Sequence, residues 1–388
     1  MNITLAGPID TQMLRRLSGR GIPGAPNGQG GAPVSDLAAG LLRAGHRVNI
    51  ATLDASIEVP QTFVDEDLTI TYVPWRAPPR YRTRTRMLDL FEQEIRGLER
   101  AIRAFDGEFV HGHWSYEYGE AAIRSKLPHL ITLHDLGWDY FWIMRDAYRF
   151  MRLIMKYRVM LRARHISVVG PFMQKKLWQY GYFGRSVAIP NGIILPERSN
   201  VDLATRLGGP LRFVTIGNAG NIKNVRASVL AFRTIRARYP QAELHLFGPG
   251  LGPDFAAGEP NVIGHGNVSH GDLMTFLREQ ATVLVHPSRI EACPVIIAEA
   301  KAMSVPVVGG WRSGGVPFVC SEDAGCLLVD IEDPAAIAEA ALTIVADPTV
   351  YRSMAEKARL DTETRFASDV VTARYLAVYD DILSGRWA

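Results

Sequence analysis

The chain has 388 residues, 47% of them hydrophobic and 21% charged, which is too long for one hydrophobic core and favours two domains. No stretch approaches the roughly 20 apolar residues that span a bilayer, and no secretion signal precedes the first strand pattern. The three cysteines show no metal-ligand spacing and favour a reducing compartment. We therefore expect a cytoplasmic protein, with at most peripheral contact at the inner face of a membrane.

Strand and helix patterns alternate along the chain, which predicts the α/β class with parallel sheets covered by helices. In the front half, strands are expected at residues 3–5, 48–51, 69–72, 109–111, 130–132, 166–168 and 187–189. Helices are expected there at residues 33–43, 87–105, 119–124, 148–162 and 171–180. Residues 7–32 are glycine-rich and long for a strand-to-helix connection, so we expect a functional lid or a partly disordered loop.

The back half repeats this alternation. Strands are expected at residues 211–215, 243–247, 262–263, 283–285, 306–308 and 326–328, and helices at residues 225–238, 271–278, 295–303, 335–345, 350–359 and 368–384. Turn residues cluster at 190–200, which makes this segment the best boundary. We expect one domain at residues 1–195, a second at 196–365, and a C-terminal helix within 366–388 that packs back toward the first.

The front half is basic, because residues 1–190 contain 25 Lys and Arg against 18 Asp and Glu. Much of the excess lies in residues 80–86 and 145–164. In the second stretch the basic residues interleave with apolar ones, which fits a helix that touches an anionic membrane or acceptor, or equally a solvated amphipathic helix. No nucleic-acid motif accompanies the charge, so nucleic acid is not an expected partner.

Two glutamates, Glu291 and Glu299, flank the start of an apolar helix in the back half. Pro294 suits the first helical position, which places Glu291 in the loop and Glu299 in the helix. Because a helix N-terminus offers free N–H groups to a phosphate, acids beside it suggest hydrogen bonds to sugar hydroxyls. The alternative is that Glu291 caps the helix and Glu299 points to solvent.

Two glycine-containing turns add signals for a phosphate ligand. Gly30 and Gly31 precede a helix, where backbone N–H groups can approach a diphosphate, although a simple flexible turn is an equal alternative. Lys223 stands just before a helix, where its charge opposes the helix dipole unless an anion binds there. An exposed loop lysine is the other interpretation.

Histidines stand at the ends of two expected strands of the front half. The segments are His111-Gly-His113-Trp114 and Thr132-Leu-His134-Asp135. Carboxyl ends of parallel strands share one edge of a sheet, so both segments are expected at one crevice, with Asp135 able to orient His134. The alternative is that these histidines are structural.

Taken together, these residues resemble the retaining GT-B glycosyltransferases of family 4, the glycosyl transferases group 1. The resemblance rests on Gly217-x5-Lys223, Pro-Ser before Glu291-x7-Glu299, the stretch after Glu299 and Gly314-Gly315-Val-Pro in the back half. The front-half signals are the Gly-Gly turn, Ala44-Gly45-His46, the histidine segments and Ile189-Pro-Asn-Gly192. The match covers nearly the full length.

The resemblance implies two Rossmann-like, doubly wound domains that face each other across a cleft, with a nucleotide diphosphate sugar, most simply a UDP-sugar, held mainly by the second. Lys223 would pair with the diphosphate, Glu299 with the ribose, and Glu291 would lie near the donor sugar. Backbone groups of Val295 and Ile296 would meet the nucleotide and phosphates. The resemblance further places His134 near the anomeric carbon, with Gly30 and Gly31 facing the donor. The implied acceptor side comprises His113, Trp114 and Asp135.

Two departures from the family pattern weaken this assignment. Asn218 stands where the family often has an arginine beside the lysine, which halves the positive charge unless a residue such as Arg226 substitutes. Phe318 replaces a usual glutamate after the Gly-Gly-x-Pro segment. Donor binding weaker than is usual in the family is the expected consequence.

The implied activity is retaining hexosyl transfer to a carbohydrate, lipid-linked or small-molecule acceptor, in exopolysaccharide, lipid-linked glycan or natural-product glycoside synthesis. No metal or cofactor is expected, because Lys223 and helix N-termini would stabilise the leaving diphosphate. Two rivals stay open. One is a nucleotide-sugar epimerase of the same fold, and the other is a non-catalytic nucleotide-binding module at a membrane.

Overall fold

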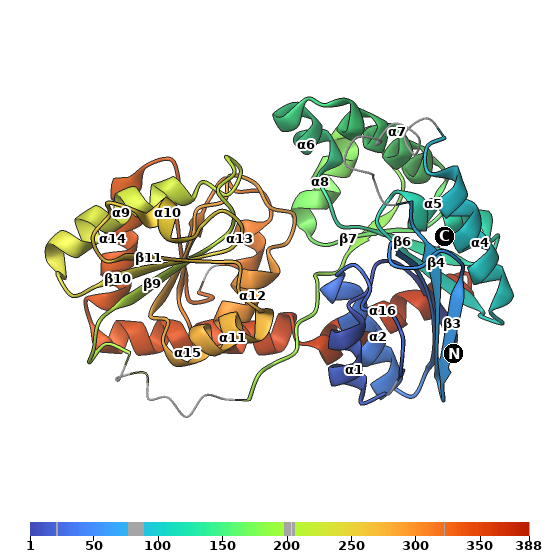
Figure 1. Ribbon diagram of the computed structural model, residues 1–388, viewed down its shortest axis with the longest axis horizontal. Coiled ribbons are helices and arrows are strands. Elements are labelled where there is room, and N and C mark those ends of the chain that lie inside the picture. Colours follow the sequence, from blue (N-terminus) through green and yellow to red (C-terminus); the bar gives the residue numbers. More distant parts are fainter. Residues whose placement is uncertain (21, 77–88, 198–202, 204–205, 322, 388) are drawn as a thin grey trace. The chain divides into compact units, whose positions relative to one another are not determined.

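The computed structural model describes residues 1–20, 22–76, 89–197, 203, 206–321 and 323–387, and it divides into two compact units (Figure 1). Unit 1 comprises Met1–Gly192 with Ser368–Ala388, and unit 2 comprises Ile193–Ala367. These boundaries lie within three residues of the expected ones. The two-domain α/β architecture expected from the sequence is confirmed.

Unit 1 is built on an eight-stranded sheet in the order β3-β4-β2-β1-β5-β6-β7-β8. The strands are β1 (Asn2–Ala6), β2 (Arg47–Asp54), β3 (Gln61–Asp65), β4 (Leu68–Pro74), β5 (Phe109–His113), β6 (His129–Leu133), β7 (Ile166–Val168) and β8 (Ser186–Ala188). All neighbours pair in parallel except β3 with β4. The carboxyl ends of β5 and β6 therefore lie side by side, which brings the residues after them to one edge.

The helices of unit 1 that the structure describes are α1 (Thr11–Ser18), α2 (Ala32–Arg43), α4 (Glu92–Ala104), α5 (Glu117–Arg124), α6 (Gly137–Met144), α7 (Ala147–Arg162), α8 (Pro171–Gln179) and α16 (Ser368–Leu383). The C-terminal α16 packs beside α2 (Figure 1), where Arg43 donates to Ser368 Oγ at 2.9 Å. The hydroxyl of Tyr379 lies 2.6 Å from His111 Nδ1. The last helix is thus part of the core of the first sheet.

Unit 2 holds a six-stranded parallel sheet in the order β11-β10-β9-β12-β13-β14. Its strands are β9 (Arg212–Ile216), β10 (Glu243–Phe247), β11 (Val262–Gly266), β12 (Val283–His286), β13 (Val307–Gly310) and β14 (Cys326–Val329). Its helices are α9 (Val225–Arg238), α10 (Pro253–Ala256), α11 (His270–Glu279), α12 (Val295–Ala302), α13 (Val316–Val319), α14 (Pro334–Val345) and α15 (Pro348–Arg365). β9 and β12 are central, so the loops after them meet at one point of the edge.

Several elements depart from the sequence expectations. Residues 7–32, expected to be a functional lid or a partly disordered loop, contain the ordered helix α1, whose Leu14 is buried. Strand β3 and helices α6, α10 and α13 were also not expected. The segment at residues 80–86 lies outside the described residues.

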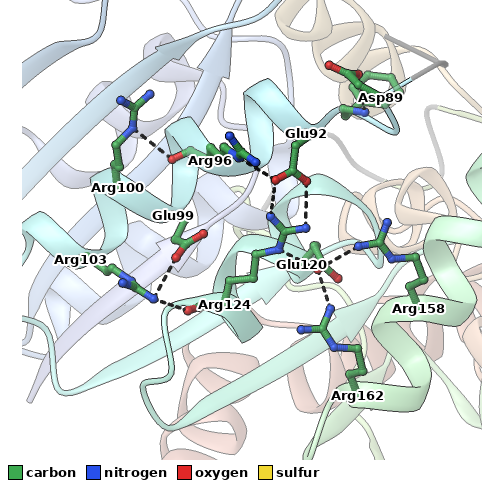
Figure 2. A network of polar contacts seen from close by, with 11 residues as sticks. Asp89, Glu92, Arg96, Glu99, Arg100, Arg103, Glu120, Arg124, Arg158 and Arg162 are labelled. Carbon is green, nitrogen blue, oxygen red and sulfur yellow. Dashed lines mark hydrogen bonds and ion pairs between the residues drawn. The ribbon is translucent and has the colours of Figure 1, made fainter.

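The basic stretch at residues 145–164 forms α7, and much of its charge is paired within unit 1 (Figure 2). Arg158 and Arg162 both approach Oε1 of Glu120, at 3.4 and 2.6 Å. Glu120 also accepts from Arg124 at 2.8 Å, and Arg124 in turn binds Glu92 through two bonds of 2.8 and 2.9 Å. Burial raises the pKa of Glu120, but Arg124 and Arg162 outweigh it and lower the pKa below its usual range.

Helix α7 is therefore anchored by its basic face rather than solvated along it. No helix among the described residues is both long enough and apolar enough to cross a bilayer.

Candidate active site

Unit 2 has a pocket of about 510 Å³ at the carboxyl ends of its strands. Residues that follow β9, β10 and β12 line it, together with the first residues of α11 and α12. Five of the residues expected at the donor line this pocket, namely Asn218, Lys223, Glu291, Val295 and Ile296, and Gly217 of the glycine–lysine segment lines it as well. In open parallel sheets this edge is where ligands bind.

Lys223, Glu291 and His286 form the polar centre of the pocket. Nζ of Lys223 lies 2.5 Å from Oε1 of Glu291, and Nε2 of His286 lies 3.3 Å from the same oxygen. Burial raises the pKa of Glu291, but His286 and Lys223 outweigh that effect and lower the pKa to about 2. Glu291 is thus an anion at neutral pH, held between a lysine and an imidazole.

Glu291 does not cap the helix, so that alternative is wrong. The N-cap of α12 is Pro294 in an extended conformation, one residue before the helix, and no side chain caps the helix there. The backbone of Glu291 instead pairs with the segment before α13, since its carbonyl accepts from Gly315 N–H at 2.7 Å. A Cβ at Gly315 would approach the Ala292 carbonyl oxygen to 1.9 Å, which makes glycine necessary at this contact.

The uncapped N-terminus of α12 opens onto the pocket through Val295 and Ile296. The first N–H groups of a helix carry partial positive charge and suit an anion such as a diphosphate. Lys223 lines the same pocket, so two sources of positive potential converge there.

Glu299 lies one turn further along α12 and does not point freely to solvent. Its Oε1 is 2.8 Å from Nε2 of His270, the first residue of α11, and its side chain is only 18% exposed. His270 lines the pocket and Glu299 does not. The structure therefore places Glu299 at the border of the pocket, where His270 of α11 contacts its carboxylate.

The two departures from the family pattern have local explanations. Asn218 lines the pocket, but its side-chain oxygen accepts from the Gly220 N–H at 2.9 Å and so serves a turn. Arg226 does not replace the missing arginine, because its guanidinium lies over the ring of Phe255, 5.5 Å from the centroid, and away from the pocket lining. Phe318 packs against Phe366 instead of offering a polar contact.

A buried ion pair supports the segment that contacts Glu291. Lys301 of α12 is fully buried, and its Nζ donates to the Val319 carbonyl at 2.6 Å and to Asp361 at 2.5 Å. Arg365 donates to the Phe318 carbonyl at 2.7 Å. Both cations thereby hold the C-terminal end of α13, the helix that begins after Gly315.

In unit 1 the expected histidines come together at the ends of β5 and β6. Nδ1 of His113 lies 2.9 Å from Nε2 of His134, and the Trp114 ring stacks on His134 with centroids 4.3 Å apart. Burial lowers the pKa of His134 to about 4, despite the nearby charge of Asp135. His134 is therefore a neutral imidazole at pH 7, and its ring partner is a second histidine.

Asp135 has a different role from the one expected. Its carboxylate binds Nζ of Lys156 at 2.9 Å, and its carbonyl accepts from the same ammonium at 2.6 Å. Burial raises the pKa of Asp135, but Lys156 outweighs it and lowers the pKa below its usual value. Asp135 thus ties the loop after β6 to α7 and does not orient His134.

Gly30 and Gly31 end the loop before α2, with positive φ at both residues. A Cβ at Gly31 would meet the Pro8 carbonyl oxygen at 2.0 Å, whereas one at Gly30 would meet nothing. Only Gly31 is therefore required by the local packing, and no side chain caps α2 after it.

Sequence reasoning missed His286 and His270 as members of the pocket. His286 ends the buried strand β12, which is the same signal that singled out the histidines of unit 1. His270 follows a Ser269 N-cap and carried no comparable signal. In the described part of the chain, no group of three or more His, Cys, Asp or Glu side chains is arranged to hold a metal ion.

Two Rossmann-like units, one with a pocket at the carboxyl ends of its central strands, define the GT-B class of proteins. The solved sucrose-phosphate synthase of Thermosynechococcus elongatus has this fold, with a TM-score of 0.77 and 20% identity over 99% of this chain and 100% of that one. An Anabaena protein solved with UDP and glucose gives a TM-score of 0.69 at 14% identity, over 98% and 99% of the two chains.

Sequence profiles assign the same class to both halves of the chain. Residues 33–195 match Glycosyltransferase Family 4, and residues 210–347 match Glycosyl transferases group 1. The chain belongs to this family of group 1, family 4 glycosyltransferases. The N-acetyl-alpha-D-glucosaminyl L-malate synthase of Bacillus anthracis is 27% identical over 179 residues, a match that spans 44% of this chain and only 45% of that protein.

Proposed function

We propose that this protein transfers a sugar from a nucleoside diphosphate sugar to an acceptor hydroxyl. The observation that carries the proposal is the convergence of Lys223, Glu291 and the uncapped α12 N-terminus on one pocket of unit 2. A cation and helix N–H groups suit a diphosphate, and an ionised carboxylate suits the hydroxyls of a sugar. UDP-sugars are the first donors to test, since an Anabaena protein of the same fold was solved twice in complex with UDP.

The proposed roles follow the positions of the side chains. Lys223 and the N–H groups of Val295 and Ile296 bind the diphosphate, and Asn218 lies beside them. Glu299 binds the ribose hydroxyls after small movements of its side chain and of His270. Glu291 accepts hydrogen bonds from the donor sugar.

Unit 1 would supply the other side of the reaction. His134 meets the sugar near its anomeric carbon as a neutral hydrogen-bonding group, because its pKa of about 4 leaves it uncharged at pH 7. Gly31 and Gly30 present backbone N–H groups, and the acceptor binds beside His113, Trp114 and the loop of Asp135.

The proposed transfer retains the anomeric configuration and needs no metal. The bond from the anomeric carbon to the β-phosphate oxygen breaks, and a new bond forms to the acceptor oxygen on the same face. The acceptor proton passes to a phosphate oxygen, so the products are a glycoside and a nucleoside diphosphate. Lys223 and the α12 N-terminus stabilise the charge that develops on the leaving diphosphate, an effect worth about 3 kcal/mol per preorganised donor.

Two further features bear on acceptor and location. The three cysteines are free thiols, which supports a reducing compartment such as the cytoplasm. The acceptor belongs to one of three classes, carbohydrate, lipid-linked or small-molecule, and the loops of unit 1 are the place to seek its determinants.

Calorimetric titration with UDP-, GDP- and ADP-sugars tests the proposal, followed by turnover assays with an acceptor library in buffer with and without EDTA. Binding of one donor class, transfer that survives EDTA, and a product with the donor's anomeric configuration by NMR are expected. A changed sugar without acceptor would identify an epimerase. Binding without turnover on any acceptor would identify a non-catalytic module, and no binding to any nucleotide would overturn the proposal.

A further inference from the structure

Helix α7 is apolar on two opposite faces. One face packs into unit 1 through Met151, Met155 and Val159, which are at most 5% exposed. On the other, Phe150, Ile154 and Leu161 are 53%, 40% and 70% exposed. An amphipathic surface helix needs only one apolar stripe, which packs on the core. The second, exposed stripe of α7 therefore indicates a surface that binds something else.

Exposed apolar side chains also occur on α6, which is followed directly by α7. Arg145 in the left-handed conformation ends α6, and Asp146 caps α7 by accepting from the Arg149 N–H at 2.8 Å. The last turn of α6 exposes about half of each of three large side chains, those of Trp142, Ile143 and Met144. We call these three residues with Phe150, Ile154 and Leu161 the outer face of α6 and α7.

A second exposed apolar site lies on α8 and the loop after it. Trp178 and Phe183 are 67% and 82% exposed. Helix α8 is bound to α6, because Nζ of Lys176 lies 2.7 Å from the Asp139 carboxylate. The three helices α6, α7 and α8 are thus connected parts of unit 1 (Figure 1).

Positive charge predominates around these apolar sites, where Asp139 and Asp146 are the nearest acids in the sequence and pair with Lys176 and Arg149. Residues 147–196 contain nine Lys and Arg and no Asp or Glu, and unit 1 as a whole has 27 basic against 21 acidic residues. Several of these cations are paired with acids of other segments, but Arg145, Arg164 and Lys175 are exposed and have no ion pair within the described ranges. The apolar sites are therefore bordered by unneutralised positive charge.

We propose that the outer face of α6 and α7, with Trp178 and Phe183, docks unit 1 on the surface of a bilayer that contains anionic lipid. Tryptophan and other large apolar side chains enter the interface, while the neighbouring Arg and Lys meet lipid phosphates. A second copy of the chain fits less well, because a two-fold contact would set the same basic residues against each other. The inference goes beyond sugar transfer and needs no turnover.

Vesicle sedimentation with the full-length protein tests the docking. The protein is expected to bind vesicles made of phosphatidylcholine and phosphatidylglycerol in equal parts. It is expected not to bind vesicles made only of phosphatidylcholine. Combining Trp142→Ser with Phe150→Ser should lower the partition coefficient about tenfold or more, because two large apolar side chains leave the interface. Charge reversal by Arg164→Glu with Lys175→Glu should lower it about tenfold at low salt.

Matched controls are Leu230→Ser and Leu360→Ser, which remove exposed leucines of unit 2 and should leave vesicle binding unchanged. Thermal unfolding reports whether each variant is folded, independently of the membrane. The proposal would be overturned if the wild-type protein did not bind anionic vesicles. It would also be overturned if the surface variants bound them as well as the wild type does. A concentration-dependent dimer abolished by Trp142→Ser would assign the face to a second copy instead.

Discussion

Lys223 donates to Glu291 across 2.5 Å, so the cation that would meet a donor diphosphate is already paired with an acid of the same pocket. Both side chains are largely screened from solvent, with exposed fractions of 29% and 12%. A charged pair in such a setting interacts more strongly than an exposed one. A diphosphate must therefore compete with Glu291 for Lys223. Substitutions of Glu291 should for this reason change nucleotide affinity and sugar transfer in opposite directions.

The competition predicts opposite effects of two substitutions on UDP affinity. Glu291→Gln frees Lys223 and should raise UDP affinity up to about tenfold, whereas Lys223→Met removes the cation and should lower it about tenfold to a hundredfold. Sugar transfer should fall in both variants, in Glu291→Gln because the donor sugar loses a charged acceptor. Calorimetry with UDP, alongside turnover, measures this. A parallel loss of UDP affinity in both variants would show that Glu291 itself binds the nucleotide.

Glu299 and His270 predict a test for ribose recognition. If Glu299 binds ribose hydroxyls, the wild type should bind UDP about ten times more tightly than 2′,3′-dideoxy-UDP, and Glu299→Ala should lose this preference. His270→Ala should reduce the preference by less, because it removes only the 2.8 Å contact that holds the carboxylate. Thr343→Ala, an exposed change on α14, is the control. If the wild type and Glu299→Ala preferred UDP over 2′,3′-dideoxy-UDP to the same extent, Glu299 would not bind the ribose hydroxyls.

The sequence predicted all six strands of unit 2, because most of them are short apolar runs, but it missed α10 and α13, which are only four residues long. Strand β3 was missed since it is half exposed and alternates polar residues, such as Gln61 and Asp65, on an antiparallel edge. Helix α1 was missed because its polar sequence sits within a glycine-rich segment and only Thr11 and Leu14 are buried.

The site residues were predictable where a sequence motif directly follows a central strand. Lys223, Glu291 and the start of α12 follow central strands, and topology alone brings such residues to one edge. The partners of these residues were not predictable, because His113 with His134 and Lys156 with Asp135 meet through tertiary packing. Adjacency in sequence suggested Asp135 as the partner of His134, and the fold placed it against α7 instead.

Buried histidines predict a loss of stability in mild acid. Burial lowers the pKa of His134 from 6.5 to about 4, and it lowers the pKa values of His111, His113 and His129 as well. Between these pH values the unfolded chain binds protons that the folded chain does not, so the free energy of unfolding falls as pH falls. Denaturant unfolding at several pH values should show this decline beginning near pH 6.5, at up to about 1.4 kcal/mol per pH unit for each such histidine. A flat profile down to pH 4 would contradict it.

The bond between His113 and His134 predicts a positioning role for His113. His113→Phe removes the Nδ1 atom that lies 2.9 Å from His134 Nε2, so the imidazole loses its fixed tautomer and kcat should fall about tenfold or more. His113→Asn offers a polar atom at the same place and should restore part of kcat. UDP affinity should stay unchanged, because the nucleotide pocket lies in unit 2. Equal kcat in the Phe and Asn variants would reduce His113 to a packing residue.

The ion pair of Lys301 and Asp361 predicts an asymmetry in the stability of unit 2. Asp361→Asn leaves the ammonium of a fully buried lysine without its carboxylate, and this should cost about 3–5 kcal/mol in the free energy of unfolding. The double variant Lys301→Met with Asp361→Asn removes both charges and should recover most of that loss. Denaturant unfolding of the four proteins in the cycle measures the coupling. Because Lys301 also holds the end of α13, Asp361→Asn should weaken donor binding as well, through the segment that contacts Glu291. Additive losses in the double variant would show that the two charges do not depend on each other.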